Sequence, residues 1–472
     1  MAPAKDNLLA MIPAVEALLQ DEAVKPWAKG LPRRIVVHSI REAVEETRQW
    51  LLSGDAGKAT VASVRETILA RARVKARCAM GPHYCKAINA TGIILHTNLG
   101  RAVLARRALR QIEEALAGYS VLEIGIETGK RGQRDTRIEW LLQQLTGCEA
   151  ATVVNNNAAA TMIVLNTVAC GKEVIVSRGQ LVEIGGSYRL PEVLAASGAK
   201  LVEVGTTNRT YASDYEAAIT DNTAAILRVH PSNFKVMGFA AEASLDELVA
   251  IARAHHLPLI DDVGAGALTD FAPFGFRDQP TLQESVRAGA DLVTSSADKL
   301  MGACQGGIIL GTATWIEAIR RNPLARVVRV GKLTLAALEA TLTLFLDEEL
   351  ALRELPTLRM LAREASDVAE QAKRIAQALQ KKVGGSEVTV IEGESQMGAG
   401  SLPTENIPTS LVAITPSRFD ASELAACLRH YSPPIFARIQ EERVLIDPRT
   451  LQDGEDEVIV KALVEILGAQ KS

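Results

Sequence analysis

A lysine with two hydroxyl residues shortly before it follows an apolar, strand-like run at residues 291–294. Ser295 and Ser296 end this run, and Lys299 comes three residues after Ser296. A lysine in such a place can lose its hydration, which lowers its pKa and suits imine formation with an aldehyde. Ser296 is near enough to contact a phosphate on the same bound molecule. A lone lysine after a strand is usually a surface residue, so the interpretation depends on other features of the chain.

Two acids end another apolar run, at residues 257–260, directly before a glycine-rich turn. They are Asp261 and Asp262, and Gly264 and Gly266 follow them. Ligands of parallel sheets bind beyond the carboxyl ends of the strands, where these acids fall. A carboxylate there could keep a pyridinium nitrogen protonated and so make the ring an electron sink. We favour Asp262 for this role, and the sequence leaves Asp261 open. Taken alone, the acids could equally cap a surface turn.

A strand, a polar turn and a helix start built from small residues are expected at residues 153–160, VVNNNAAA. Free N–H groups and the helix dipole make such a start an anion site, with Asn157 and Ala158 as candidate phosphate contacts. Taken alone, the motif is better explained as a simple asparagine N-cap. The order of this motif, the strand-end aspartate and Ser-x-x-Lys is typical of fold-type I pyridoxal-phosphate enzymes. Asn233 lies where such enzymes contact the ring hydroxyl. Together these features predict pyridoxal 5'-phosphate bound at Lys299.

Other classes of site find little support. The six cysteines are scattered without a CxxC pair, and the seven histidines lie far apart, so we expect neither a disulfide framework nor a metal centre. Walker A, HExxH, GxSxG and GxGxxG motifs are absent from the sequence. The net charge of −4 gives no global field for nucleic acid, although the chain through Lys86 carries +5. Without a signal peptide or a long apolar run, a cytoplasmic protein that does not enter a membrane is expected.

The pattern of apolar residues changes near residue 88. Residues 8–77 have helical spacing, with a break expected at 54–57. Short apolar runs then alternate with amphipathic helices, which predicts an α/β fold with a mostly parallel central sheet. A long helical stretch at 333–379 precedes a small α/β domain with an antiparallel sheet. We therefore predict a helical N-terminal domain (1–80), a catalytic domain that binds the cofactor (81–340) and a C-terminal domain (341–472).

Several long stretches resemble one family, the bacterial selenocysteine synthases or L-seryl-tRNA(Sec) selenium transferases. They include INATGIILHTNLGRAVL (88–104), ETGKRGQR (127–134), GKEVIVSRGQLVEIGGSYRLPEV (171–193), VEVGTTNRT (202–210), NPLARVVRVGKLTLAALEATL (322–342) and GAGSLPTENIPTS (398–410). The resemblance runs over nearly the whole chain. It implies a fold-type I pyridoxal-phosphate transferase with a helical N-terminal domain that docks selenocysteine tRNA. It also implies a homo-oligomer built from dimers, up to a decamer, with active sites at dimer interfaces.

The resemblance also implies a reaction. The seryl group on selenocysteine tRNA would become a selenocysteinyl group, through an aminoacrylyl-tRNA held by the cofactor, with selenophosphate as donor. Lys299 would remove the Cα proton and Asp262 would stabilise the resulting charge. Family members place arginines for the anionic donor at positions that match Arg101, Arg326 and Arg329, and guanidinium groups suit a phosphate-like anion. Arg326 and Arg329 are three residues apart, so on a helix they would share one face.

The chain departs from the family pattern around the lysine. Ala297 and the pair Ala303-Cys304 replace glycines and a proline, and Gly331 replaces an aspartate. These changes leave open a second enzyme class, a lyase that acts on a small, phosphorylated amino compound. Such a lyase has no evident use for the N-terminal helical domain. A non-enzymatic RNA-binding protein would be expected to have lost Lys299 or Asp262.

Overall fold

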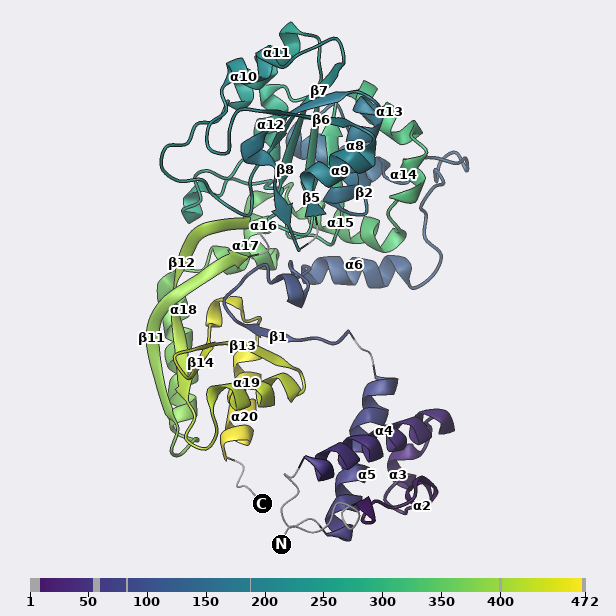
Figure 1. Cartoon of the computed structure of the whole chain (residues 1–472), viewed down its shortest axis with the longest axis vertical. Coiled ribbons are helices and arrows are strands. Elements are labelled where there is room, and N and C mark those ends of the chain that lie inside the picture. The colour runs from purple at the N-terminus through teal and green to yellow at the C-terminus, as the bar shows by residue number, and fades with distance from the viewer. Residues whose placement is uncertain (1–8, 54–59, 82–83, 187, 399–400, 469–472) are drawn as a thin grey trace. The chain divides into compact units, whose positions relative to one another are not determined.

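The computed structural model describes residues 9–53, 60–81, 84–186, 188–398 and 401–468 (Figure 1). The chain divides into two compact units, Met1–Lys86 and Ala87–Ser472. The break predicted at 54–57 lies outside the described residues. Among the described helices, none has the length and apolar character that crossing a membrane requires.

The first unit is a small helical bundle. Its helices are α2 (Val15–Leu19), α3 (Lys25–Ala28), α4 (Arg33–Leu52) and α5 (Val61–Met80). Apolar side chains three and four residues apart, such as Val36, Ile40 and Val44, form one buried face of α4. The Thr60 side chain accepts a hydrogen bond from the backbone N–H of Ser63 and so begins α5. The predicted helical character of this region is confirmed for the residues described.

The second unit contains a seven-stranded sheet with the strand order β2-β10-β9-β8-β7-β3-β6. Its strands are β2 (Ala150–Val154), β3 (Glu173–Ser177), β6 (Lys200–Val204), β7 (Thr223–Val229), β8 (Leu259–Gly264), β9 (Leu292–Ser296) and β10 (Gly307–Gly311). Strand β10 is antiparallel to both of its neighbours, and the remaining pairs are parallel. The predicted mostly parallel sheet is therefore confirmed. Most of these strands are apolar runs because both faces of the sheet are covered.

Helices lie against both faces of this sheet (Figure 1). The helices that contact its strands are α7 (Thr136–Thr146), α8 (Asn157–Ala169), α9 (Leu190–Ser197), α11 (Leu245–Ala254), α12 (Leu282–Ala288) and α13 (Ala313–Arg321). In addition, α10 (Ala212–Ala217) packs on α11, α14 (Leu324–Val327) packs on α13, and α15 (Lys332–Leu344) packs on α7 and on α6 (Arg106–Leu116). A short hairpin, β4 (Glu183–Ile184) and β5 (Tyr188–Arg189), precedes α9. This arrangement leaves the carboxyl ends of β7, β8 and β9 at one edge of the sheet.

The long helical stretch predicted at 333–379 is helical, but it is divided into four consecutive helices. The segment forms α15, α16 (Glu348–Glu354), α17 (Pro356–Leu361) and α18 (Ala365–Gln380). The Asp347 side chain accepts a hydrogen bond from the Leu350 N–H and starts α16. Pro356 occupies the first position of α17, where its missing N–H costs nothing. Local capping therefore divides a stretch whose apolar spacing is helical throughout.

A second sheet has the order β1-β13-β14-β12-β11. Its strands are β1 (Ile88–Ala90), β11 (Glu387–Gly398), β12 (Ser401–Thr415), β13 (Ile435–Gln440) and β14 (Arg443–Ile446), with α18, α19 (Ala421–His430) and α20 (Glu455–Gly468) packed against it. Four strands pair antiparallel, as predicted, whereas β1 adds a parallel edge strand from far away in sequence. Figure 1 shows β11 and β12 as a long curved hairpin.

Candidate active site

Two neighbouring parallel strands, β8 and β9, carry the predicted catalytic residues. Asp262 lies near the end of β8, in register with Thr294 on β9. Lys299 follows the last residue of β9 by three positions. Asp262 and Lys299 each shift the pKa of the other through their charges. Both side chains therefore lie in one buried region at the carboxyl edge of the sheet.

Gly266 allows the turn after β8 to pass close to the end of β9. Its φ is +72°, which favours glycine, and a Cβ would lie 2.4 Å from Ser295 Oγ and 2.6 Å from the Ser296 carbonyl oxygen. A larger residue would have to push the two strand ends apart. The glycine-rich turn seen in the sequence thus has a packing function next to the site.

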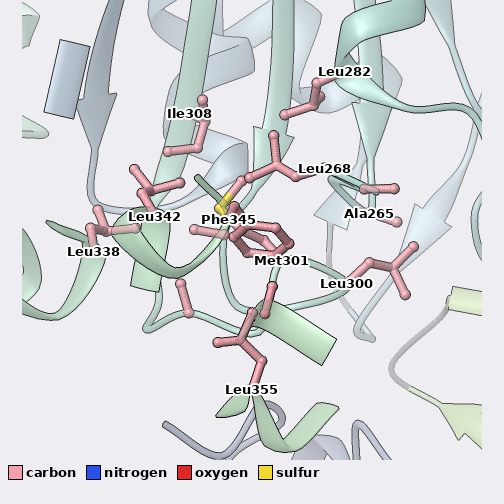
Figure 2. Packing of buried hydrophobic residues seen from close by; sticks show 14 of the residues in the cluster. Ala265, Leu268, Leu282, Leu300, Met301, Ile308, Leu338, Leu342, Phe345 and Leu355 are labelled. Atoms are coloured by element: carbon pink, nitrogen blue, oxygen red, sulfur yellow. The ribbon is translucent and has the colours of Figure 1, made fainter. Parts of the chain in front are cut away.

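The residues after Lys299 anchor it in the hydrophobic core. Leu300 and Met301 are buried, and Figure 2 shows Met301 beside Phe345, with Leu338 and Leu342 nearby. The Leu300 N–H donates to the Ala265 carbonyl at 3.1 Å. Buried side chains and a backbone hydrogen bond together fix the segment that presents the lysine. Two of the residues that differ from the family pattern, Ala297 and Ala303, belong to the same core.

The Lys299 side chain is in an environment that favours its neutral amine. The residue is 5% exposed. Burial lowers the pKa of Lys299, and the positive charge of Arg101 lowers it further. Asp298 and Asp262 oppose this shift. A neutral amine is the form that can attack an aldehyde carbon or accept a proton.

The Asp262 carboxylate is buried and receives three hydrogen bonds. Asn157 Nδ2 donates to Oδ1 at 2.9 Å, and the Gly264 N–H donates to the same oxygen at 3.2 Å. Thr161 Oγ1 donates to Oδ2 at 3.1 Å. Burial raises the pKa of Asp262, while the hydrogen bonds and the charge of Lys299 favour the ionised form.

Asp261 has different partners. Its Oδ1 accepts a hydrogen bond from Arg228 Nη1 at 2.8 Å, and its Oδ2 accepts one from Ser285 Oγ on α12 at 2.6 Å. Successive residues of a strand point to opposite faces of a sheet, so Asp261 and Asp262 face different layers. Both oxygens of Asp261 are therefore already used, Oδ1 in an ion pair with Arg228 and Oδ2 in the hydrogen bond from Ser285. This geometry favours Asp262 as the acid that faces Lys299.

Helix α8 begins beside Asp262. The Asn156 side chain accepts a hydrogen bond from the Ala159 N–H at 2.9 Å, so the asparagine N-cap considered for this motif is present. Asn157 and Ala158 are the first helical residues and are half-buried. Their N–H groups lie at the positive end of the helix dipole. Ser296, at the end of β9, is buried and in register with Gly307 of β10.

Asn233 lies in the segment that follows β7. Its Nδ2 donates to the Glu183 carbonyl at 2.8 Å. The segment is tied to β8 because the His230 N–H donates to the Asp262 carbonyl at 2.9 Å. Within the described part of the chain, Asn233 Oδ1, Ser232 Oγ and Asn157 Oδ1 are buried and have no hydrogen-bond partner. An unpaired buried polar atom costs about 1–3 kcal/mol, so these atoms indicate a place for a polar ligand.

Arg101 lies close to the lysine. Its Nη1 is 2.7 Å from Asp298 Oδ2, and Asp298 directly precedes Lys299. The backbone of Arg101 is left-handed, with φ of +63°. This conformation costs a residue with a Cβ about 1–2 kcal/mol, and such strain concentrates at functional sites.

Arg326 and Arg329 line a different cavity, of about 420 Å³, together with four further arginines, Arg131, Arg134, Arg320 and Arg321. Arg326 and Arg329 do not lie on one helix, so the condition for a shared helix face is not met. Helix α14 ends at Val327, and Arg329 forms a β-bridge with Val154 instead. The Asn155 N–H also donates to the Val328 carbonyl at 2.9 Å, which draws this segment into an extended conformation. Within a single chain, Arg101 is not among the described residues that line this cavity.

Sequence reasoning missed three neighbours of the predicted residues: Thr161, Tyr188 and Asp298. Thr161 lies four residues after Asn157, so helical spacing could have indicated it. Burial raises the pKa of Tyr188, and the negative charge of Asp262 adds to this rise, which places its phenol near the carboxylate. Tyr188 comes from the β4–β5 hairpin, so its position near Asp262 depends on tertiary structure alone.

A larger cavity, of about 500 Å³, lies on the side of Arg228 and includes His230, Ser232 and Arg209, but neither Lys299 nor Asp262. Burial, with a contribution from Arg228, lowers the pKa of His230 to about 4, so this histidine is neutral near pH 7. We assign the chemistry to the strand ends beside Lys299, because the buried lysine and carboxylate are there.

Comparison with known proteins identifies the family. Residues 87–452 match the family model described as L-seryl-tRNA selenium transferase, and residues 9–48 match the model described as selenocysteine synthase N terminal. A relative from Alkaliphilus metalliredigens (strain QYMF), named L-seryl-tRNA(Sec) selenium transferase, is 45% identical over 464 residues, 97% of this chain and 98% of the relative. A relative of the same name from Alkaliphilus oremlandii (strain OhILAs) is 43% identical over 469 residues, which cover 98% of this chain and 99% of the relative.

A solved structure described as D-glucosaminate-6-phosphate ammonia-lyase superposes with a TM-score of 0.55 at 24% identity, covering 82% of this chain and 96% of that one. At this identity the likeness concerns the fold. The predicted class, a fold-type I pyridoxal-phosphate transferase with a mostly parallel central sheet, is confirmed. By its match over most of its length, the chain belongs to the L-seryl-tRNA selenium transferase family.

Proposed function

We propose that this chain converts L-seryl-tRNA(Sec) to L-selenocysteinyl-tRNA(Sec), with pyridoxal 5'-phosphate as cofactor and selenophosphate as selenium donor. The observation that carries the proposal is the family match, which spans both the helical N-terminal unit and the unit with Lys299. A tRNA-dependent step of protein synthesis belongs in the cytoplasm, as expected from the sequence. The lyase alternative has less support, because its match is limited to the fold.

The residues around Lys299 fit pyridoxal phosphate. Lys299 would attach to its aldehyde carbon, Asp262 would hold a proton on the ring nitrogen, and Asn233 would contact the ring hydroxyl through its unpaired Oδ1. The phosphate would lie at the start of α8, against the N–H groups of Asn157 and Ala158. Ser296 would contribute a hydroxyl to the same phosphate.

When bound, the cofactor supplies a conjugated ring that takes up the electron pair left at Cα after proton removal. The chain's own residues have defined tasks in this step. The Lys299 amine, whose pKa is lowered by burial, would accept the Cα proton of the seryl group. The buried Asp262 carboxylate would keep the ring nitrogen positively charged.

The overall exchange balances without an oxidant. The seryl Cβ–O bond breaks, a Cβ–Se bond forms, and the phosphorus of the donor exchanges its selenium for an oxygen, so that phosphate is released. Arg101 would pair with an anionic donor near Lys299. Arg326 and Arg329 lie in a second arginine-rich cavity, and in an assembly of dimers they would face the site of another copy.

The first unit would bind the tRNA. Arg73 and Arg77 on α5 are exposed and four residues apart, so they lie on one helix face. Replacing both with glutamate should weaken binding of the selenocysteine tRNA and make it less dependent on salt, because phosphate contacts release counterions. Filter binding at several salt concentrations would measure both effects. Equal binding of this tRNA and serine tRNA would contradict the proposal.

The direct test is turnover of seryl-tRNA(Sec) with selenophosphate by the full-length protein. Selenocysteinyl-tRNA should form with the wild type and with Lys172→Ala, an exposed lysine beside β3, but not with Lys299→Ala. Arg326→Gln should reduce turnover at limiting selenophosphate. Absence of product together with ammonia release from a phosphorylated amino sugar would overturn the proposal in favour of the lyase.

A further inference from the structure

The Asp262 carboxylate depends on helix α8 for two of its hydrogen bonds. Asn157 donates to Oδ1 and Thr161 to Oδ2, and these two residues are one helical turn apart. Thr161 is 0% exposed, and its hydroxyl faces a carboxylate that is itself 4% exposed. A fully buried hydroxyl that has no role in the reaction is thus directed at a buried carboxylate of the site.

We propose that Thr161 is a positioning residue that fixes the orientation and negative charge of Asp262, and so sets how strongly the ring nitrogen of the cofactor is held and protonated. The inference rests on the proposed use of pyridoxal phosphate. Thr161 acts through Asp262 and is not itself a catalytic residue.

The local geometry shows why a threonine suits this position. Its Oγ1 lies 3.0 Å from the Asn157 carbonyl oxygen and 3.1 Å from Asp262 Oδ2, so one hydroxyl proton has two acceptors. A helical threonine often donates back to the carbonyl four residues earlier. Here the Asn157 carbonyl can also accept the helical N–H of Thr161. The buried charge of Asp262 gains more from the hydroxyl than this neutral carbonyl does. The β-branched side chain restricts χ1 and keeps the hydroxyl in place.

The electrostatics support the same role. Burial opposes the charged form of Asp262, and the hydrogen bond from Thr161 is among the interactions that offset this cost. Two further titratable groups face the carboxylate, Lys299 and Tyr188. Without the hydroxyl, Asp262 would be freer to rotate and to take up a proton. The ring nitrogen would then lose part of its positive charge.

The experiment compares Thr161→Val and Thr161→Ser with Thr341→Val in the full-length protein loaded with cofactor. Thr341 is a matched control because it is also 0% exposed and donates to the carbonyl four residues earlier, at 2.9 Å. It differs in lying on α15 and in donating to the Ala337 carbonyl rather than to a carboxylate. Absorption spectra recorded across pH report protonation of the Lys299 nitrogen that is bonded to the cofactor's aldehyde carbon. Dilution followed by gel filtration reports how tightly the cofactor is held.

Thr161→Val should release cofactor about tenfold more readily, the lower end of the effect of one hydrogen bond to a charged group. The pH midpoint of its absorption change should move up by about half to one unit. The reason is that a ring without positive charge leaves the lysine nitrogen on the cofactor's aldehyde carbon more basic. Thr161→Ser should recover most of both properties. Thr341→Val should keep the wild-type midpoint, whatever its effect on thermal stability.

A Thr161→Val protein with the midpoint and cofactor retention of Thr341→Val would overturn the inference. If Thr161→Val does not fold, Thr161→Ala and Thr161→Ser provide the same comparison, and equal midpoints in those two would overturn it as well. A wild-type protein that shows no cofactor absorption would refute the proposed function itself, whereas a normal wild-type titration unaffected at Thr161 would refute this inference alone.

Discussion

Replacing each of the adjacent aspartates of β8 by asparagine should separate folding from cofactor chemistry. The Asp261→Asn protein should lose stability but still bind pyridoxal phosphate once folded. The Asp262→Asn protein should keep its stability but lose tight cofactor binding and activity. The two side chains have the same size and adjacent positions, so the comparison isolates the difference in their partners.

The expected loss of stability follows from the ion pair of Asp261. This residue is 0% exposed, and its carboxylate contacts Arg228 Nη1 at 2.8 Å, whose side chain is 17% exposed. An amide leaves the guanidinium without a counter-charge, and removing one partner of a buried pair costs about 3–5 kcal/mol. The hydrogen bond with Ser285 can survive, because an amide oxygen still accepts.

The balance differs at Asp262. An asparagine there keeps an acceptor for Asn157 and the Gly264 N–H, and Thr161 can accept from the new amide. Removing a buried charge also removes its desolvation cost, so the free energy of unfolding should change by no more than about 1 kcal/mol. An amide cannot hold a proton on the ring nitrogen. At about 3 kcal/mol for a charged hydrogen bond, turnover should fall by roughly 100-fold.

Urea unfolding of the cofactor-free proteins, followed by circular dichroism, measures the first effect. Equilibrium dialysis with pyridoxal phosphate and turnover of seryl-tRNA(Sec) measure the second. The expected pattern is a lower unfolding midpoint for Asp261→Asn alone and weaker cofactor binding for Asp262→Asn alone. The reverse pattern would show that Asp261 faces the cofactor, and the reasoning from strand alternation would then be refuted.

Further predictions concern the lysine and the turn before it. Lys299→Ala should lack the absorption band of the lysine-linked cofactor, and borohydride should fail to fix the cofactor to the protein in mass spectra. Arg101→Gln should raise the pKa of Lys299 and Asp298→Asn should lower it, because the charges of Arg101 and Asp298 act in opposite directions. The pH midpoint for attachment of cofactor to the apoprotein should therefore rise in Arg101→Gln and fall in Asp298→Asn. A shift of the same sign in both variants would contradict this. Gly266→Ala should lower the free energy of unfolding by about 1–3 kcal/mol more than Gly275→Ala does. Both glycines have positive φ, but a Cβ at Gly275 meets nothing within 4 Å. Equal unfolding midpoints of the two variants would exclude the close packing around Gly266.

The sequence predicts the central sheet well because parallel strands covered on both faces leave a simple signal. The runs at 151–154, 173–176 and 307–310 each agree with a strand of the structure to within one residue at either end. Ligands of such sheets bind at the strand ends, and the same signal also predicted that Asp262 and Lys299 lie at the ends of β8 and β9. The edge strand β1 escaped prediction because its partner β13 is more than three hundred residues away.

The errors arise where distant segments decide local structure. Arg329 has helical spacing from Arg326, yet its backbone pairs with Val154. The choice between Asp261 and Asp262 depends on which face of β8 the lysine approaches. Alternation along a strand predicts that the two acids point apart, but it cannot assign a face to either. The charge effect of Asp262 on the pKa of Lys299 and the ion pair of Arg228 with Asp261 supply that information.

Helix α8 connects two requirements that the sequence presented as separate. Its first N–H groups lie where a phosphate is expected, and its Asn157 and Thr161 side chains hold the carboxylate expected at the other end of the same ring. A spacing of four residues puts both side chains on one face of the helix, toward β8. A shift of α8 relative to β8 would therefore disturb the phosphate and the ring nitrogen together. Residues four apart at the start of a helix where a phosphate is expected can thus be predicted as hydrogen-bond partners of a strand-end aspartate. Neither the helix start nor the aspartate predicts these partners alone.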